Sequence, residues 1–181
     1  MRRYFSFLAL FVVVAAICAF AATMGALPAV CDTTIGVARS PYVQAASGTT
    51  YYVAPDGDDA NPGTLDAPWA TPGYGSRQLR PGDTLVILGG RYILSRYDDD
   101  IIAPPSGTTD AWITIKGEAN HRPILVGRDN LAMAIDLSGV SYVRIENLEV
   151  THDDQASGEG IYFRDGIVIA GQPASHIVLQ D

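Results

Sequence analysis

Short stretches of alternating apolar and polar residues, each bounded by glycine, proline or asparagine, run from about residue 50 to the end of the chain. Alternation with a period of two is typical of β-strands that bury one face. Beyond the apolar N-terminal segment no window shows the longer period of a competing helix. The pattern therefore predicts an all-β domain over residues 50–181. Strands are expected at residues 51–53, 84–88, 111–117, 123–127, 134–139, 142–146, 148–150, 166–171 and 176–180.

The spacing of these stretches is nearly constant. Val143 follows Ile113 at an offset of 30, and the strand pair at 134–139 and 142–146 recurs at 166–171 and 176–180 with an offset of 33 or 34. A fixed period of this length, built from strands and turns, is typical of a solenoid whose coils stack along one axis. The alternative is a propeller, whose blades need four strands in a somewhat longer repeat.

The alternation changes parity at Asn147. Val143 and Ile145 share one parity, whereas Leu148 and Val150 have the other. Because asparagine tolerates the left-handed backbone conformation, we expect a sharp bend there that lets both flanking strands point apolar side chains inward. The expected core column, stacked coil on coil, is Leu85/Ile87, Ile113/Ile115, Val143/Ile145 and Ile177/Leu179.

The N-terminus has the pattern of an export signal. Arg2 and Arg3 precede a stretch without charges over residues 4–30, and Ala19 and Ala21 fit a small-x-small cleavage site. We expect residues 1–30 to be a cleaved signal peptide, followed by a linker over 31–49, which predicts a secreted or cell-surface protein. The alternative is an uncleaved membrane anchor, since the apolar run approaches the ~20 residues that span a bilayer.

Charge and cysteine content exclude several classes. The net charge is −8, the only lysine is Lys116, and no basic run exists, so nucleic-acid binding is not expected. An acidic chain is compatible with bound Ca²⁺. Cys18 lies in the apolar N-terminal run and Cys31 then has no partner, so no disulfide framework is expected. We expect a monomer.

Four motifs resemble the opening of secreted right-handed parallel β-helix proteins, including the pectate lyases of polysaccharide lyase family nine. They are residues 51–64 (YYVAPDGDDANPGT), 67–71 (APWAT), 81–84 (PGDT) and 89–92 (GGRY). The resemblance covers roughly residues 50–181 and implies a right-handed parallel β-helix of which the chain holds the N-terminal cap and first coils. Because solenoids need a terminal cap, we expect a truncated product. Relatives usually carry a short capping helix after residue 71. Here residues 72–75 (PGYG) interrupt that stretch, so a regular helix is not expected.

The resemblance also implies a function. In similar lyases a base removes the proton beside a uronate carboxylate, and Ca²⁺ held by aspartates neutralises that carboxylate. We therefore expect a parent protein that acts on extracellular polysaccharide, by preference a calcium-dependent lyase. The lysine base of that family lies on a later coil, so we do not assign its role to Lys116 and expect this chain alone to be inactive. The alternative is a non-catalytic cell-surface or carbohydrate-binding β-helix.

Acidic residues after residue 150 are the best metal candidates. Asp153 and Asp154, with Glu159 and Asp165 close behind, are oxygen ligands on a loop, which suit Ca²⁺. The competing interpretation is an acidic loop in water. Residues 98–100, three aspartates in a row, are interpreted as a solvated insertion.

Outward positions on the stacked strands are the substrate candidates. The alternation places Lys116, Arg144 and Glu146 on the outer face, along which the substrate groove of related proteins runs. Arg144 is suited to pair with a sugar carboxylate. The favoured alternative is that it pairs with Glu146 or with a neighbouring coil.

Overall fold

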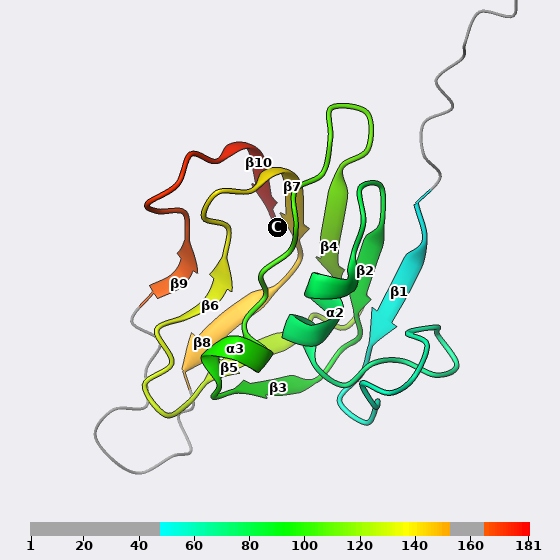
Figure 1. Ribbon diagram of the computed structural model, residues 1–181. Helices are drawn as coiled ribbons and strands as arrows, with labels where there is room; N and C mark the ends of the chain where they lie inside the picture. The colour runs from blue at the N-terminus through cyan, green and yellow to red at the C-terminus, as the bar shows by residue number, and fades with distance from the viewer. Residues whose placement is uncertain (1–47, 153–164) are drawn as a thin grey trace, which may run out of the picture. The chain divides into compact units, whose positions relative to one another are not determined.

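The computed structural model describes residues 48–152 and 165–181, which form a parallel β-solenoid with two short helices (Figure 1). The strands are β1 Thr50–Val53, β2 Thr84–Ile87, β3 Arg91–Leu94, β4 Ile113–Gly117, β5 Ile124–Gly127, β6 Met133–Asp136, β7 Ser141–Glu146, β8 Glu149–His152, β9 Asp165–Val168 and β10 Ser175–Gln180. The helices are α2 Pro72–Gln78 and α3 Tyr97–Asp100.

Successive coils stack their strands into three parallel sheets. One sheet has the order β1-β2-β4-β7-β10, the second β3-β5-β8 and the third β6-β9. The ladder joins Ile113 to Val143, which confirms the offset of 30. It joins Ser141 to Ser175, an offset of 34, whereas Ile135 joins Ile167 with an offset of 32 where 33 or 34 was expected. The solenoid prediction is confirmed, and the propeller alternative is wrong.

The core is the apolar column that the stacking creates. Leu85, Ile115 and Ile145 lie side by side in successive coils, and the first two are fully buried. The expected alignment of Leu85 with Ile113 is wrong by two positions. Asp83, in the turn before β2, takes the position in line with Ile113. Its carboxylate accepts the backbone N–H groups of Thr49 and Arg80, each at 2.8 Å, and so fixes this turn. In the last coil Leu179 is in register with Ile145 but is 50% exposed.

Asn147 forms the predicted bend between β7 and β8. Its φ is 51°, in the left-handed region, and its side-chain amide donates to the Glu118 carbonyl at 2.8 Å. Leu148 and Val150 after the bend pack against the core, as the change of parity predicts.

Helix α2 forms despite its proline and glycines, which corrects the expectation of an interrupted segment. Pro72 occupies the start of the helix, where its missing N–H would have no intrahelical partner in any case. Gly73 and Gly75 are buried at close approaches: a Cβ on Gly73 would lie 2.2 Å from the Asp99 carbonyl oxygen. The glycines thus let α2 lie against α3 and the core instead of breaking the helix (Figure 1).

Strand β3 was not predicted from the sequence. It follows Gly89 and Gly90 directly and pairs with β5 in the second sheet. Tyr92 and Leu94 point inward while Arg91 and Ile93 are exposed, so its four residues do alternate. A strand this short gives little periodic signal next to a glycine pair.

Tyr92 links the second sheet, β3-β5-β8, to the C-terminal ends of β1 and β2. Its hydroxyl donates to the Leu88 carbonyl at 2.8 Å and lies 3.2 Å from the Val53 carbonyl. Burial raises the pKa of Tyr92 well above its usual range, and the nearby charges of Asp56 and Glu118 raise it further. The folded chain therefore keeps this phenol neutral.

Replacing Gly73 by alanine should destabilise the fold although alanine favours helix by about 1 kcal/mol. The added methyl would collide with the Asp99 backbone, and such overpacking costs about 1–3 kcal/mol. Denaturant unfolding measures the effect. The exposed Gln78→Ala change in the same helix is the control, expected within about 0.5 kcal/mol of wild type. A stabilised Gly73→Ala protein would contradict the close approach.

Replacing Tyr92 by phenylalanine should cost about 0.5–1.5 kcal/mol near neutral pH, because the half-buried Leu88 carbonyl loses its donor. The unfolded chain ionises its tyrosines near pH ~10 whereas folded Tyr92 stays neutral, so this advantage of wild type should shrink as the pH rises above about 10. Unfolding curves for both proteins across that range test it, with exposed Tyr97→Phe as the control. An advantage that grows with pH would have the wrong sign.

Candidate functional site

The outward face of the five-stranded sheet brings the three predicted substrate-binding residues together. Lys116 on β4 lies in register with Glu146 on β7, and Arg144 lies in register with Thr114 on β4 and Val178 on β10. Their positions follow from the core, because Ile113, Ile115, Val143 and Ile145 alternate with them and point inward. The predicted outward rows are confirmed.

Arg144 and Glu146 form an ion pair on this face. The Arg144 Nη1 donates to Glu146 Oε1 at 3.3 Å, which confirms the favoured alternative for Arg144. The side chains are 40% and 27% exposed, so the pair is open to solvent and to a ligand. The Arg144 guanidinium carries five N–H donors, and Glu146 accepts one of them. The ion pair alone therefore does not occupy all the donors of Arg144.

The charge on this face differs from that of the whole chain. Within the described strands β1, β2, β4, β7 and β10, the Lys, Arg, Asp and Glu residues are Lys116, Arg144 and Glu146 alone. Two cations and one anion give the face a positive excess, although the chain carries −8 overall. An acidic ligand therefore meets less repulsion here than the net charge of the whole chain implies.

An aromatic row flanks the same face, and sequence reasoning missed it. Trp112, Tyr142 and His176 occupy equivalent positions in three successive coils, each just before the inward residues Ile113, Val143 and Ile177. The Tyr142 and His176 rings stack with centroids 4.4 Å apart, and the Trp112 ring meets Tyr142 edge-on at 5.7 Å. The regular offsets of 30 and 34 between these three positions were the signal that could have revealed the row.

Of the predicted calcium ligands, Asp165 belongs to the described residues, and it does not lie on this face. Asp153, Asp154 and Glu159 lie outside the described residues. Asp165 begins β9 and is exposed, on a different sheet from Lys116 and Arg144. Among residues 48–152 and 165–181 no group of three or more His, Cys, Asp or Glu side chains is placed to hold a metal ion. Calcium binding thus stays a prediction.

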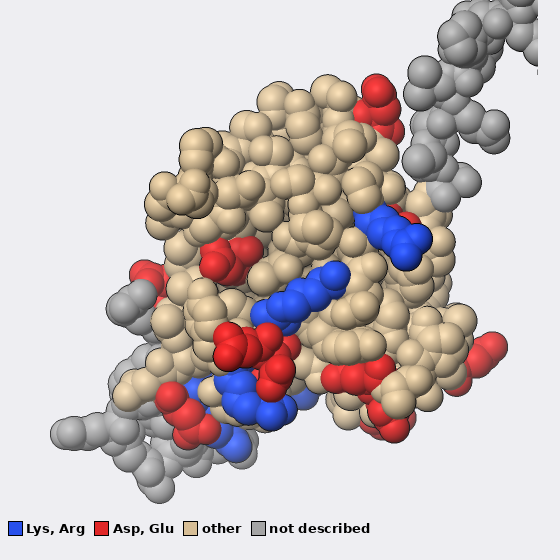
Figure 2. Space-filling model, in the orientation of Figure 1, with Lys and Arg blue, Asp and Glu red and all other residues tan. Residues whose placement is uncertain are grey.

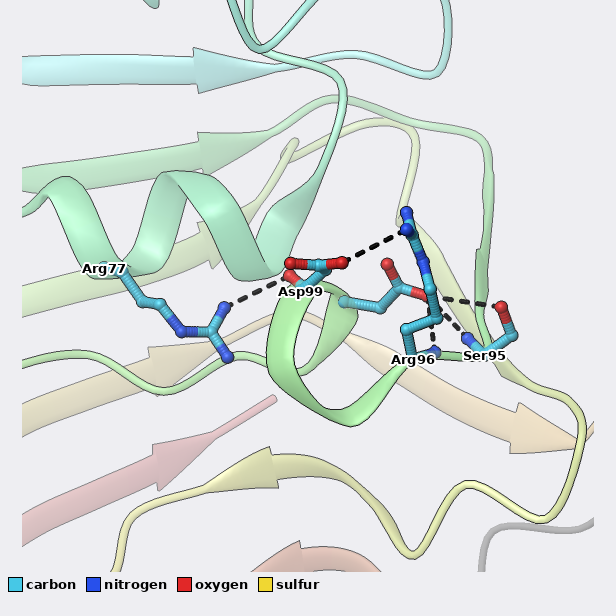
Figure 3. Close-up of polar contacts among 5 residues, drawn as sticks. Arg77, Ser95, Arg96 and Asp99 are labelled. Atoms are coloured by element: carbon cyan, nitrogen blue, oxygen red, sulfur yellow. Dashed lines mark hydrogen bonds and ion pairs between the residues drawn. The ribbon is translucent and has the colours of Figure 1, made fainter.

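The densest charged surface in the view of Figure 2 lies instead around α2 and α3. Arg77 donates to the Asp99 carbonyl at 3.1 Å, and Arg96 pairs with the Asp99 carboxylate at 3.2 Å (Figure 3). Asp100 is buried, and its carboxylate accepts the backbone N–H groups of Ser95 and Arg96 at 2.6 and 2.8 Å. The run at 98–100 is therefore a solvated insertion only in part, since Asp100 holds the start of α3 in place.

In the described part of the chain, no helix is both long and apolar enough to cross a membrane. The proposed anchor over residues 1–30 lies outside that part, so the choice between a signal peptide and an anchor stays open.

A family model described as the Pel9A-like, right handed beta helix region matches residues 51–175. The chain belongs to this Pel9A-like family. The match covers most of the described coils and confirms the right-handed parallel β-helix implied by the four motifs at its start.

Individual relatives of this Pel9A-like chain are longer proteins. A lacto-N-biosidase of Bifidobacterium longum subsp. longum is 31% identical over an alignment of 140 residues, and the match covers 60% of this chain and 8% of that protein. The uncharacterized protein YwoF of Bacillus subtilis is 28% identical over an alignment of 149 residues, and the match covers 75% of this chain and 28% of that protein. The chain thus spans less than a third of the curated relatives it matches.

A solved structure shares the fold. The crystal structure of the GH136 lacto-N-biosidase from Eubacterium ramulus, as its selenomethionine derivative, matches with a TM-score of 0.55 and 22% identity. The match covers 74% of this chain and 26% of that one. At this identity the likeness establishes the shared β-helix and nothing about activity.

Neutralising either member of the outward ion pair should barely change stability. Arg144→Gln and Glu146→Gln should each alter the free energy of unfolding by less than about 1 kcal/mol, since partly exposed pairs contribute little. Ile145→Ala lies between them on β7 and points into the core, so it should cost about 2–5 kcal/mol. Denaturant unfolding compares the three. A loss from either glutamine variant as large as that from Ile145→Ala would make the pair a structural element.

Proposed function

We propose that this Pel9A-like β-helix binds an extracellular polysaccharide that carries carboxylates, a uronate polymer, along the outward face of β4, β7 and β10. We propose further that the complete protein cleaves this polymer by β-elimination. The observation that carries the proposal is the pair of cations, Lys116 and Arg144, on adjacent strands of a face whose strands hold one carboxylate.

The geometry suits a linear acidic polymer. Lys116 and Arg144 come from neighbouring coils, whose strands stack about 4.8 Å apart along the solenoid axis. Lys116 is in register with Glu146 and Arg144 with Thr114, so the two cations stand two positions apart along their strands. A chain that crosses the coils at an angle to the axis can present successive carboxylates to these two side chains. Arginine binds carboxylates with two parallel N–H donors, whereas lysine supplies a compact point charge.

β-Elimination gives these cations a role in chemistry as well as in binding. The step removes the proton on the carbon beside the uronate carboxylate and expels the glycosidic oxygen, and a cation on that carboxylate stabilises the charge that develops. Lys116 and Arg144 can supply such charge. The base is not assigned to any described residue, and the acidic residues described do not gather into a calcium site, so no step is assigned to calcium.

A glycosidase is the second candidate, favoured by the 31% identity with a lacto-N-biosidase. Glycoside hydrolysis generally uses two carboxyl groups flanking the scissile bond. The described strands of the outward face supply only Glu146, already paired with Arg144, so further carboxylates would have to come from elsewhere in the protein.

Binding of this chain to polygalacturonate, compared with an uncharged galactan, tests the ligand class. Arg144→Gln and Lys116→Gln should each weaken polygalacturonate binding roughly two- to fivefold, the range of an exposed charge pair. Glu146→Gln should strengthen it, because it removes the competing anion. Added salt should weaken binding by screening. Equal binding of both polymers, unchanged in the variants, would contradict the proposal.

Cleavage is tested with the complete natural protein on polygalacturonate, with and without calcium. Release of unsaturated product that chelation abolishes supports a calcium-dependent lyase. Reducing ends without unsaturation would favour the glycosidase, and binding without any product would favour the non-catalytic alternative.

A further inference from the structure

Trp112 stands against the side of the Tyr142–His176 stack. Its ring is nearly perpendicular to both, at 80° and 88°, and its centroid lies 5.7 Å from Tyr142 and 6.5 Å from His176. Because these distances are similar although the two rings lie in successive coils, Trp112 does not continue the stack. It is braced by both rings at once.

The brace is built on unusual backbone. Tyr142 has φ 59° and His176 has φ 55°, in the left-handed region that tyrosine rarely enters and that histidine enters more readily. Such conformations cost about 1–3 kcal/mol each and persist where the surroundings enforce them, often at functional sites. The strand pairing joins Ser141 to Ser175 and Val143 to Ile177, and it skips Tyr142 and His176 between them. The same local distortion in two coils is what brings the two rings into register.

The other neighbour of Trp112 is Arg144. The Arg144 guanidinium carbon lies over the indole ring, 5.8 Å from its centroid. Tryptophan is the strongest aromatic partner for a cation, and the flat guanidinium of arginine packs well on an aromatic ring. Arg144 is therefore held from two sides, by the indole and by the Glu146 carboxylate at 3.3 Å.

We propose that Trp112, braced by Tyr142 and His176, is a positioning residue that holds the Arg144 guanidinium on the outward face, ready to receive a sugar carboxylate. This inference rests on the proposed binding of a uronate polymer. A free arginine side chain must be immobilised when it binds, and a side chain already held in place avoids most of that entropy loss. Trp112 thus contributes to affinity through Arg144, and its own contact with sugar is not required.

A double-mutant cycle separates the two routes. Trp112→Ala should weaken polygalacturonate binding about two- to fivefold, the range of an exposed cation–π contact. In an Arg144→Gln background the same change should have almost no further effect, because the residue it positions is gone. Trp112→Phe keeps an aromatic ring, so its affinity should lie between those of wild type and Trp112→Ala. It replaces Trp112→Ala in the cycle if the alanine protein does not fold. An equal loss in both backgrounds would mean that Trp112 binds sugar directly and would overturn the proposal.

NMR of the arginine side chain tests positioning without any ligand. The indole ring current should shift the Arg144 side-chain protons, and Trp112→Ala should remove that shift, whereas Trp112→Phe should keep part of it. Tyr52→Ala is the matched control: it truncates another half-buried aromatic on the outward side of this sheet, on β1, and should leave the Arg144 signals unchanged. Unchanged Arg144 signals in Trp112→Ala would overturn the positioning role.

The two readouts fail independently. If wild type does not bind polygalacturonate, the proposed function fails, and the role of Trp112 toward Arg144 then stands or falls on the NMR comparison. If wild type binds but Trp112→Ala leaves both the affinity and the Arg144 signals unchanged, the positioning inference fails while the proposed function stands.

Discussion

Parallel stacking of one coil on the next is the constraint on which the rest of this structure depends. Each strand must pair with its predecessor in a register that keeps the apolar side chains inward, since a slip by a single position would turn Ile145 out and Arg144 in. The same hydrogen bonds that align Ile115 with Ile145 also align Lys116 with Glu146. The candidate site therefore follows from the core, because the core dictates which polar residues meet on the outer face.

The register forces some residues into strained backbone conformations. At Asn147 the strain is small, because asparagine tolerates the left-handed conformation and its side chain donates to the Glu118 carbonyl of the preceding coil. Tyr142 adopts the same conformation without that tolerance, and its ring stacks on that of His176, which shares the conformation, at 4.4 Å. Strain at these two positions thus coincides with the one place in the described coils where aromatic side chains from three coils gather beside a charged group.

Alternation and spacing predicted most of the strands, the bend at Asn147 and the outward placement of Lys116, Arg144 and Glu146, because each depends on a period that the sequence displays directly. The alignment of Leu85 depended on a tertiary contact, the carboxylate of Asp83 on two backbone amides, which no period reveals. Helix α2 was missed for a related reason. Glycine was interpreted as a helix breaker, whereas Gly73 is needed for a backbone approach of a neighbouring segment.

The aromatic row was missed because its members are unremarkable one by one and gain meaning only from the register. Trp112 lies just before β4 and His176 near the start of β10, and the coil-to-coil register places them in the coils before and after that of Tyr142. An outward position in a solenoid is relieved of packing constraints, so its residue type can change at little cost to the fold. Trp112, by contrast, lies against a half-exposed arginine and is supported by two neighbours whose left-handed backbone costs stability. Its presence on this face, beside the two cations, fits the role proposed for Arg144 better than any requirement of the fold.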